Sequence, residues 1–304
     1  MLTSLVVHLT LMLLLAPLLP GIITRVKALI AGRRGQPLLQ LYRDLRKLFG
    51  KEMVISPTTT WVFRAGPLAG VAVPLLAALL VPFGPFAAPL SFTGDLIVFV
   101  YLLALARFFT VLAALDTGSS FEGMGAAREV TFAVLVEPTI FVAFIVLARM
   151  AGDFSLDAMF RAGIADQALQ SESAIILPFI SLCLFVVLLA ENCRIPFDDP
   201  NTHLELTMIH EVMVLDHSGP DFGLILTGAA MKLLLFAALV VNLLLPATGN
   251  LAVDAAAFVA GLFAVAVAVG LVESAMARLR LIRVPQLLVG TTLLSFFALI
   301  LLLR

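Results

Sequence analysis

The sequence has few of the residues that bind metals and clusters. Two of its 304 residues are cysteines, Cys183 in an apolar run and Cys193 in a polar stretch. An iron–sulfur cluster typically takes four thiolates, so this chain cannot ligate one. Neither a zinc site nor a disulfide framework is indicated. We therefore expect no metal and no redox centre on this chain, and any redox chemistry that it serves needs cofactors on another subunit.

Charge is also scarce. Charged residues make up 13% of the chain, about half of the roughly 25% found in soluble domains. Hydrophobic residues make up 62%, and the mean hydropathy is +1.11. The apolar runs are long and continuous, as in transmembrane helices of about 20 residues, and do not alternate as barrel strands do. The first run is longer than a signal-peptide core and has no basic residues before it, so we expect no cleavable signal. The sequence predicts an all-α polytopic membrane protein.

We predict one transmembrane domain over residues 1–304, a single bundle of eight helices without an internal repeat. The expected spans are Leu2–Ile23, Trp61–Val81, Gly94–Leu115, Val130–Met150, Ala174–Glu191, Asp221–Leu245, Ala255–Ala277 and Pro285–Leu303. Lys and Arg concentrate in cytoplasmic loops. Of the 19 in this chain, 14 fall on one side of these spans and three on the other. The side with 14 is therefore cytoplasmic, and both termini face outward.

The first cytoplasmic loop, residues 24–64, is the most basic part of the chain. Between Pro37 and Gly50, leucines recur at helical spacing with charged residues between them, and proline and glycine suit the start and the end of a helix. This pattern predicts a short amphipathic helix in the membrane interface. The alternative is that the basic residues only follow the general excess of positive charge in cytoplasmic loops.

A second cytoplasmic loop, residues 190–220, concentrates titratable side chains. It contains three of the four histidines of the chain, His203, His210 and His217. It also contains one arginine and six acidic residues: Glu191, Arg194, Asp198, Asp199, Glu205, Glu211 and Asp216. We expect this loop to have a function, and the alternative is a solvated connector between two helices.

Four further charges fall inside predicted spans: Arg107, Glu137, Lys232 and Glu273. A charge at the centre of a span costs roughly 2.5–3.5 kcal/mol and marks a functional hypothesis. At about 1.5 Å of rise per residue, Arg107 and Glu137 lie at similar depth in consecutive spans, so their side chains are placed to meet. Lys232 lies near the midplane. With Glu191, these residues suggest a polar axis for protons, and static ion pairs that hold helices in register are the alternative.

Three cytoplasmic segments carry a family resemblance. Residues 190–198, AENCRIPFD, followed by Glu205 and Leu206, resemble the A-E-x-x-R-x-P-F-D loop of complex I subunit 1. Residues 33–49, RRGQPLLQLYRDLRKLF, resemble the R-R-G-P-G-x-x-Q-x-Y-R-D-x-x-K-L-F of hydrogenase membrane subunits. Residues 115–129, LDTGSSFEGMGAARE, and VEP at 136–138 are similar to further motifs of those subunits. The chain thus resembles the membrane anchor subunits of formate hydrogenlyase-type (group 4, energy-converting) NiFe hydrogenases, which are homologous to subunit 1 of complex I, the NADH-quinone oxidoreductase.

The resemblance implies a non-catalytic subunit of a complex I-like hydrogenase complex in the cytoplasmic (inner) membrane of a bacterium or archaeon. Such a chain docks hydrogenase-like large and small subunits and an iron–sulfur protein, which carry the Fe–S clusters and the NiFe centre. It joins them to antiporter-like membrane subunits and couples electron transfer to the translocation of protons or sodium ions.

Two sets of residues are expected to do this work. The residues expected for the proton path and coupling are Arg107, Glu137, Glu191, Asp198, Asp199, Glu205, Glu211, Lys232 and Glu273. The residues expected for docking are Arg33, Arg34, Tyr42, Arg43, Asp44, Lys47, Arg128, Glu129, Arg194, His203 and His210.

Two other functions stay open. In the first, residues 190–220 wall a quinone chamber, as in NADH-quinone oxidoreductases. Asn201 and His203 stand where that family has acids, which argues against quinone. In the second, the chain is a stand-alone ion transporter. The absence of an inverted repeat with paired discontinuous helices argues against that function.

Overall fold

The computed structural model describes residues 2–160, 175–198 and 208–304, and within these ranges it contains helices and no strand. In chain order the elements are α1 (Leu2–Thr10), the π-helical turn η1 (Leu11–Leu15), α2 (Leu18–Ile30), α3 (Gln40–Phe49), α4 (Trp61–Ala78), α5 (Asp95–Asp116), α6 (Ser120–Ala151), α7 (Leu156–Phe160), α9 (Ile176–Glu191), the 3₁₀ turn η3 (Glu211–Val214), α10 (Gly219–Leu244), α11 (Leu251–Ala275) and α12 (Val284–Leu303). The predicted all-α fold is confirmed.

Seven helical segments of the described residues are long and apolar enough to cross a membrane, where eight were predicted. They are Leu2–Ile30, Trp61–Ala78, Asp95–Asp116, Ser120–Ala151, Gly219–Leu244, Leu251–Ala275 and Val284–Leu303. The eighth apolar run forms α9, whose 16 described residues fall short of the roughly 20 that a span needs. The prediction of a multi-pass membrane protein is confirmed, and its helix count is corrected.

Two helices extend furthest beyond their predicted bounds. The first continues through α2 to Ile30, and α6 begins at Ser120 rather than Val130. The residues that lead into α6 include alanine, methionine, glutamate and arginine, which are good helix formers, and the helix continues through Gly123 and Gly125 as well. As a result Arg128 and Glu129, which were expected in a loop, lie on α6.

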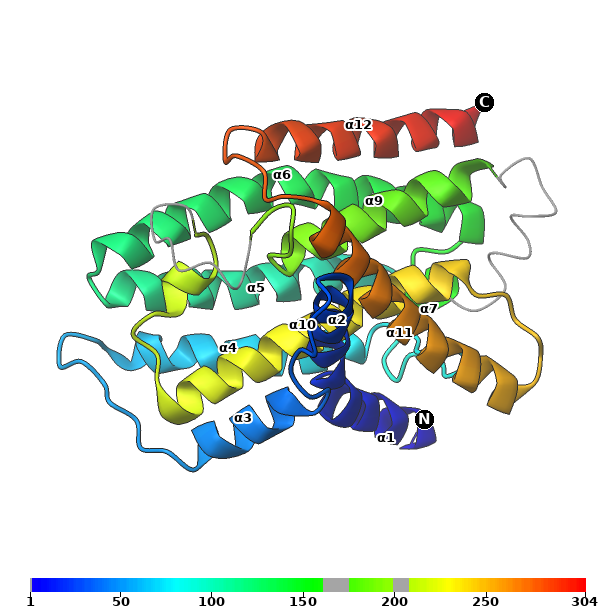
Figure 1. The fold of residues 1–304 in the computed structure, drawn as a ribbon. Coiled ribbons are helices and arrows are strands. Elements are labelled where there is room, and N and C mark those ends of the chain that lie inside the picture. Colours follow the sequence, from blue (N-terminus) through cyan, green and yellow to red (C-terminus); the bar gives the residue numbers. More distant parts are fainter. Residues whose placement is uncertain (1, 161–174, 199–207) are drawn as a thin grey trace.

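Helices α4, α5, α6, α9, α10 and α12 lie roughly along one another, and α11 runs obliquely to them (Figure 1). At one edge α12 packs on α6 and α9, while α4 packs against both α5 and α10. The centre is α10, since 67% of its most apolar stretch is buried, more than in any other of the seven spans. It also contacts α3, α9 and α11. A helix that is apolar on all sides belongs in such a position.

Close backbone approach joins α10 to α4. A Cβ atom at Gly228 would clash with the backbone oxygen of Gly70, so no larger side chain fits there. Small residues let transmembrane helices pack this closely without a strong hydrophobic driving force. This contact helps to fix the depth of Lys232, which follows one turn later on α10.

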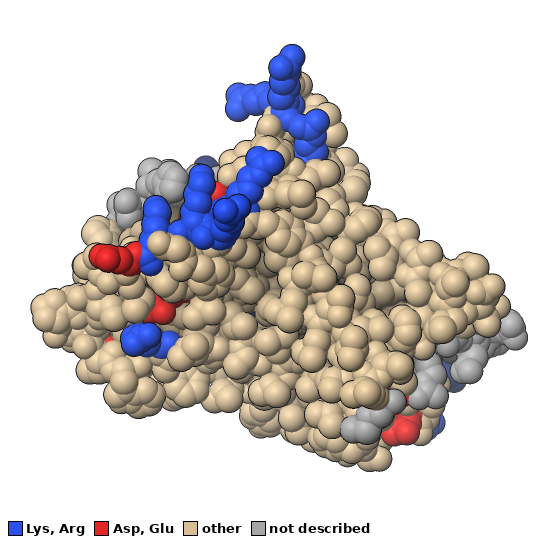
Figure 2. All heavy atoms as spheres, turned by 90° about the horizontal axis from the view of Figure 1, so that it is seen from below, with Lys and Arg blue, Asp and Glu red and all other residues tan. Residues whose placement is uncertain are grey.

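The predicted amphipathic helix is present as α3. Leu45 is its buried residue, while Arg43 and Lys47 are exposed. The helix packs on α10, where the side chain of Phe49 lies beside Gly223. Figure 2 shows that Lys and Arg gather on one part of the face seen from below, while most of the rest of that face is uncharged. We call residues 24–64 the basic segment, and its exposed basic residues are Arg33, Arg34, Arg43, Arg46, Lys47, Lys51 and Arg64.

Candidate functional site

Arg107 of α5 is the centre of a cluster of charged side chains. Its Nη1 atom lies 2.9 Å from Oε1 of Glu137, and its Nη2 atom lies 2.5 Å from Oε1 of Glu191. Its Nε atom lies 3.5 Å from Oε1 of Glu129. The meeting of Arg107 and Glu137, expected from their depth, is therefore observed. A guanidinium group suits this position because its fixed fork of donors can serve several carboxylates at once.

Glu191 extends this cluster to α10. Its Oε2 atom lies 2.7 Å from Nζ of Lys232, and its side chain is 2% exposed. Glu137, Arg107, Glu191 and Lys232 thus form a continuous series of ion pairs across α6, α5, α9 and α10. Buried charges need such partners because desolvation costs several kcal/mol per ion. We call this series the charge chain.

Glu273 belongs to a second cluster. It lies on α11, with Oε2 at 2.7 Å from Nζ of Lys27 on α2 and Oε1 at 3.4 Å from Nη1 of Arg194. This cluster ties α2 and α11 to the start of the 190–220 loop. The sequence grouped Glu273 with Lys232 in one polar axis, whereas the contacts of the described residues place Glu273 in this separate cluster.

Asp198 fixes the path of the 190–220 loop. Its Oδ1 atom lies 2.8 Å from Nη2 of Arg278, and its Oδ2 atom accepts hydrogen bonds from the backbone N–H groups of Ile209 (2.9 Å) and His210 (3.1 Å). The carboxylate therefore holds both sides of the segment 199–207 together. Three expected site residues, Asp199, His203 and Glu205, lie outside the described residues. Glu211 begins η3, directly after His210.

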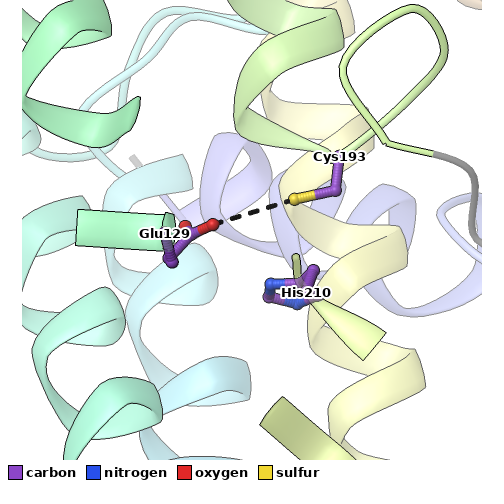
Figure 3. Close-up of side chains that lie close together, drawn as sticks. All are labelled: Glu129, Cys193 and His210. Atoms are coloured by element: carbon purple, nitrogen blue, oxygen red, sulfur yellow. Dashed lines mark hydrogen bonds between the residues drawn. The ribbon is translucent and has the colours of Figure 1, made fainter. Parts of the chain in front are cut away.

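Three side chains with metal-ligating atoms converge beside the charge chain (Figure 3). Glu129, Cys193 and His210 each offer one atom, and these atoms lie within 4.8 Å of one another. The thiol of Cys193 lies 4.0 Å from Oε2 of Glu129, the edge of hydrogen-bonding distance. Burial raises the pKa of the Cys193 thiol well above its usual range, and the carboxylate of Glu129 adds to the rise. Burial lowers the pKa of His210, so this side chain is neutral near pH 7.

The expected docking residues divide into two groups. Arg33, Arg34, Arg43 and Lys47 are exposed on the basic segment. Six of the others are held by the protein, and His203 lies outside the described residues. Tyr42 donates a hydrogen bond to the backbone oxygen of Leu14, Asp44 accepts one from Gln40, and Arg128 donates one to the backbone oxygen of Met208. Glu129, Arg194 and His210 contribute to the interior clusters described above. Their docking role stays a prediction.

Sequence reasoning assigned no role to three polar residues, of which Glu122 and His217 are buried and Lys27 is partly buried. Glu122 is fully buried on α6 and accepts a hydrogen bond from the backbone N–H of Asp216 at 3.1 Å. His217 stacks on Phe63 with ring centroids 3.9 Å apart. Lys27 pairs with Glu273. Lys27 and Glu273 both lie near the cytoplasmic ends of predicted spans, a shared depth that could have indicated the pair.

A cavity of about 180 Å³ opens beside these clusters. Pro20, Leu41 and Phe222 line it from α2, α3 and α10, and Arg194 and His210 line it from the 190–220 loop. A smaller cavity of about 80 Å³ reaches the charge chain, with Arg107 and Lys232 in its wall. Each cluster therefore has charged side chains in the wall of a cavity: Arg107 and Lys232 line the smaller one, and Arg194 lines the larger one.

Comparison with known families decides the identity of the fold. The model of the NADH dehydrogenase family matches residues 2–303. The chain belongs to the NADH dehydrogenase family. This membership agrees with the A-E-x-x-R-x-P-F-D pattern, whose Glu191, Arg194 and Asp198 all contribute to the buried clusters.

Individual relatives support the hydrogenase branch of this NADH dehydrogenase family. Formate hydrogenlyase subunit 4 of Escherichia coli (strain K12) is 34% identical over 282 residues, covering 90% of this chain and 89% of the relative. An NADH-quinone oxidoreductase subunit of Methylococcus capsulatus is 28% identical, covering 67% of this chain and 62% of the relative. A chain in the structure of a membrane-bound sulfane sulfur reductase, an archaeal respiratory membrane complex, shares the fold with a TM-score of 0.84, 24% identity and coverage of 99% and 98%. The predicted relationship to formate hydrogenlyase-type subunits is confirmed.

Proposed function

We propose that this chain is the membrane subunit that links a peripheral redox arm to ion translocation in an energy-converting hydrogenase complex. The observation that carries the proposal is the charge chain, because its Glu191 belongs to the 190–220 loop, while its Glu137 and Lys232 lie on the membrane-spanning helices α6 and α10. Full-length similarity to a formate hydrogenlyase subunit supports this assignment. The complex would lie in a cytoplasmic membrane, with both termini of this chain facing outward.

The partners follow from the same reasoning. Hydrogenase-like subunits and an iron–sulfur protein would bind the basic segment and the 190–220 loop and carry the Fe–S clusters and the NiFe centre. Antiporter-like subunits would contact the membrane-embedded helices. The exposed basic patch of α3 and its flanks suits an acidic partner surface or lipid head groups.

Coupling in this proposal is electrostatic. Reduction of a cofactor in the docked arm adds negative charge near the loop. At an effective dielectric constant of about 20, a unit charge about 10 Å away changes the proton affinity of a group by about 1.7 kcal/mol. Glu191 is suited to respond because it divides its two oxygens between Arg107 and Lys232. A small change in field would shift the proton of Lys232 or the balance between the two pairs.

The test uses variants of the charge chain in the assembled complex. Glu137→Gln and Glu191→Gln remove charge with little change of shape, and Asp199→Asn does the same in the loop. We expect fewer protons translocated per electron, with electron transfer retained. The matched control is Glu52→Gln, since Glu52 is an exposed carboxylate of the basic segment. Unchanged translocation with intact electron transfer in all three variants would contradict coupling through these residues.

A quinone chamber is the second candidate function. The observation in its favour is the cavity between α2, α3, α10 and the 190–220 loop. Its volume of about 180 Å³ is below the roughly 300–1,000 Å³ of typical ligand pockets, which favours the first proposal. Reduction of added quinone by the complex, abolished by Leu41→Trp in the wall of the cavity, would support the second. A native gel with mass spectrometry separates both from a stand-alone transporter, which would migrate without Fe–S partners.

A further inference from the structure

We propose that Glu129, Cys193 and His210 form a binding site for a divalent metal ion of the zinc type. The three residues come from three segments of the chain: α6, the turn after α9, and the residue before η3. The site joins the 190–220 loop, which contains Cys193 and His210, to α6, which contains Glu129. A metal ion there would fasten the loop to α6, independently of whether the complex translocates ions.

The geometry is close to that of a zinc site. Zinc binds thiolate sulfur at about 2.3 Å, imidazole nitrogen at about 2.0–2.1 Å and carboxylate oxygen at about 2.0–2.2 Å. Tetrahedral angles then put neighbouring donors about 3.4–3.6 Å apart. The donors here lie within 4.8 Å of one another, and the sulfur of Cys193 is 4.0 Å from Oε2 of Glu129. Side-chain movements of about 1 Å would close the site.

His210 gives a second, independent indication of a ligand. Its Nδ1 atom is buried and has no hydrogen-bond partner among the described residues. Buried polar atoms are nearly always paired, and an unpaired one calls for an explanation such as an ion. The backbone N–H of the same residue is held by Asp198 at 3.1 Å. The position of His210 is therefore fixed while a ring nitrogen stays available, as for a histidine that ligates a metal.

The surrounding charges favour a cation. Arg107 and Lys232 contribute two positive charges, and the carboxylates of Glu129, Glu137 and Glu191 contribute three negative ones, so this group carries a net charge of −1. Binding a divalent ion with loss of the thiol proton brings the total to zero, since the ion adds two charges and the thiolate removes one. The bond that forms is metal–sulfur, and the proton leaves to solvent.

Glu129 can bind a metal ion and keep its contact with Arg107 at the same time. Its Oε1 atom faces Nε of Arg107 at 3.5 Å, and its Oε2 atom faces Cys193. Binding of a metal at Oε2 therefore leaves the contact with Arg107 in place. Thiolate and imidazole ligands select zinc-type ions over magnesium and calcium, which prefer oxygen ligands alone. With three protein donors, a fourth position remains for water.

The test measures metal in the full-length chain purified in detergent. Zinc is added, excess is removed by dialysis, and bound zinc is counted by mass spectrometry. Cobalt(II) loading then reports the sulfur ligand through its thiolate-to-cobalt charge-transfer band. We expect one equivalent of metal and this band in the native chain. The matched control is Cys183→Ser, which removes the other cysteine, buried in α9. This variant should keep both the bound metal and the thiolate-to-cobalt band.

The ligand variants are Cys193→Ser and His210→Gln. Loss of a direct ligand should weaken zinc binding by more than the roughly 10–100-fold seen for outer-shell changes, and Cys193→Ser should abolish the cobalt band. Circular dichroism of each variant checks that the helices remain. The proposal is overturned if the native chain binds no zinc or shows no thiolate-to-cobalt band. It is also overturned if a helical Cys193→Ser chain retains metal as tightly as the native chain.

Discussion

The ion pair between Glu191 and Lys232 gives the sharpest test of the charge chain. Glu191→Gln keeps the shape of the side chain and removes its charge. Arg107 keeps Glu129 and Glu137 as partners, whereas Lys232 loses the carboxylate 2.7 Å away. Removing one member of a buried pair costs about 3–5 kcal/mol, because the other charge stays buried without compensation. We expect Glu191→Gln to lower the free energy of unfolding by that amount.

The second step of this test replaces the partner. Lys232→Gln leaves Glu191 with Arg107, whose Nη2 atom lies 2.5 Å from the carboxylate, so it should cost less than Glu191→Gln. The double variant removes both charges together. Its loss should be smaller than the sum of the two single losses by about 1–3 kcal/mol, the interaction energy of residues in one network.

Unfolding of the chain in detergent, followed by helical circular dichroism, measures these differences. Glu52→Gln is the control, since a change at this exposed carboxylate should stay within about 0.5 kcal/mol. If the two single losses sum to the loss of the double variant within about 0.5 kcal/mol, the pair is refuted, because independent sites behave in that way.

Three further predictions concern residues around the site. Burial lowers the pKa of His217 to about 4, so the native state resists protonation of this side chain. Its contribution to stability should be complete above about pH 6.5 and lost as the pH falls to about 4. The expected loss is about 3 kcal/mol. His217→Gln should flatten the stability profile over that range, and an unchanged profile would contradict the assignment. Gly228→Ala should cost about 1–3 kcal/mol of unfolding free energy through overpacking against α4. The control Gly290→Ala has open space around its Cβ and should be nearly neutral. Equal effects of the two substitutions would contradict the close packing. Asp198→Asn removes the ion pair with Arg278 and weakens two hydrogen bonds to the loop. We therefore expect faster amide hydrogen exchange at residues 208–210. Unchanged exchange would show that the carboxylate does not hold the loop.

Some of this arrangement could be predicted because local geometry determines it. Counting from the predicted span ends, Leu115 and Val130, puts Arg107 and Glu137 at similar depth, and the two side chains do meet. They meet although α6 begins ten residues earlier, at Ser120. A helix rises by a fixed amount per residue, so depth in two consecutive antiparallel spans can be calculated from the sequence. The amphipathic α3 was predictable for a similar reason, since the spacing of its leucines has the period of a helix.

The pair of Glu191 and Lys232 could not be predicted in this way. Their helices, α9 and α10, are separated by a long loop, and their contact depends on the crossing of two packed helices. The convergence of Glu129, Cys193 and His210 was missed for the same reason. Metal sites are recognisable in a sequence when their ligands recur at short spacings, and positions 129, 193 and 210 have no such spacing. The sequence placed all three on the cytoplasmic side without bringing them together.

Glu129 is the residue at which the loop and the charge chain meet. One of its oxygens faces Arg107, which holds Glu137 and Glu191, and the other faces the turn at Cys193. On the loop side, Asp198 fixes the backbone of His210. A change in the loop that moves Cys193 or His210 therefore changes the environment of Glu129, and with it the balance of carboxylates around Arg107. Because buried charges respond strongly to small displacements in a low dielectric, this carboxylate offers a short physical route from the 190–220 loop to Arg107 and its partners inside the helix bundle.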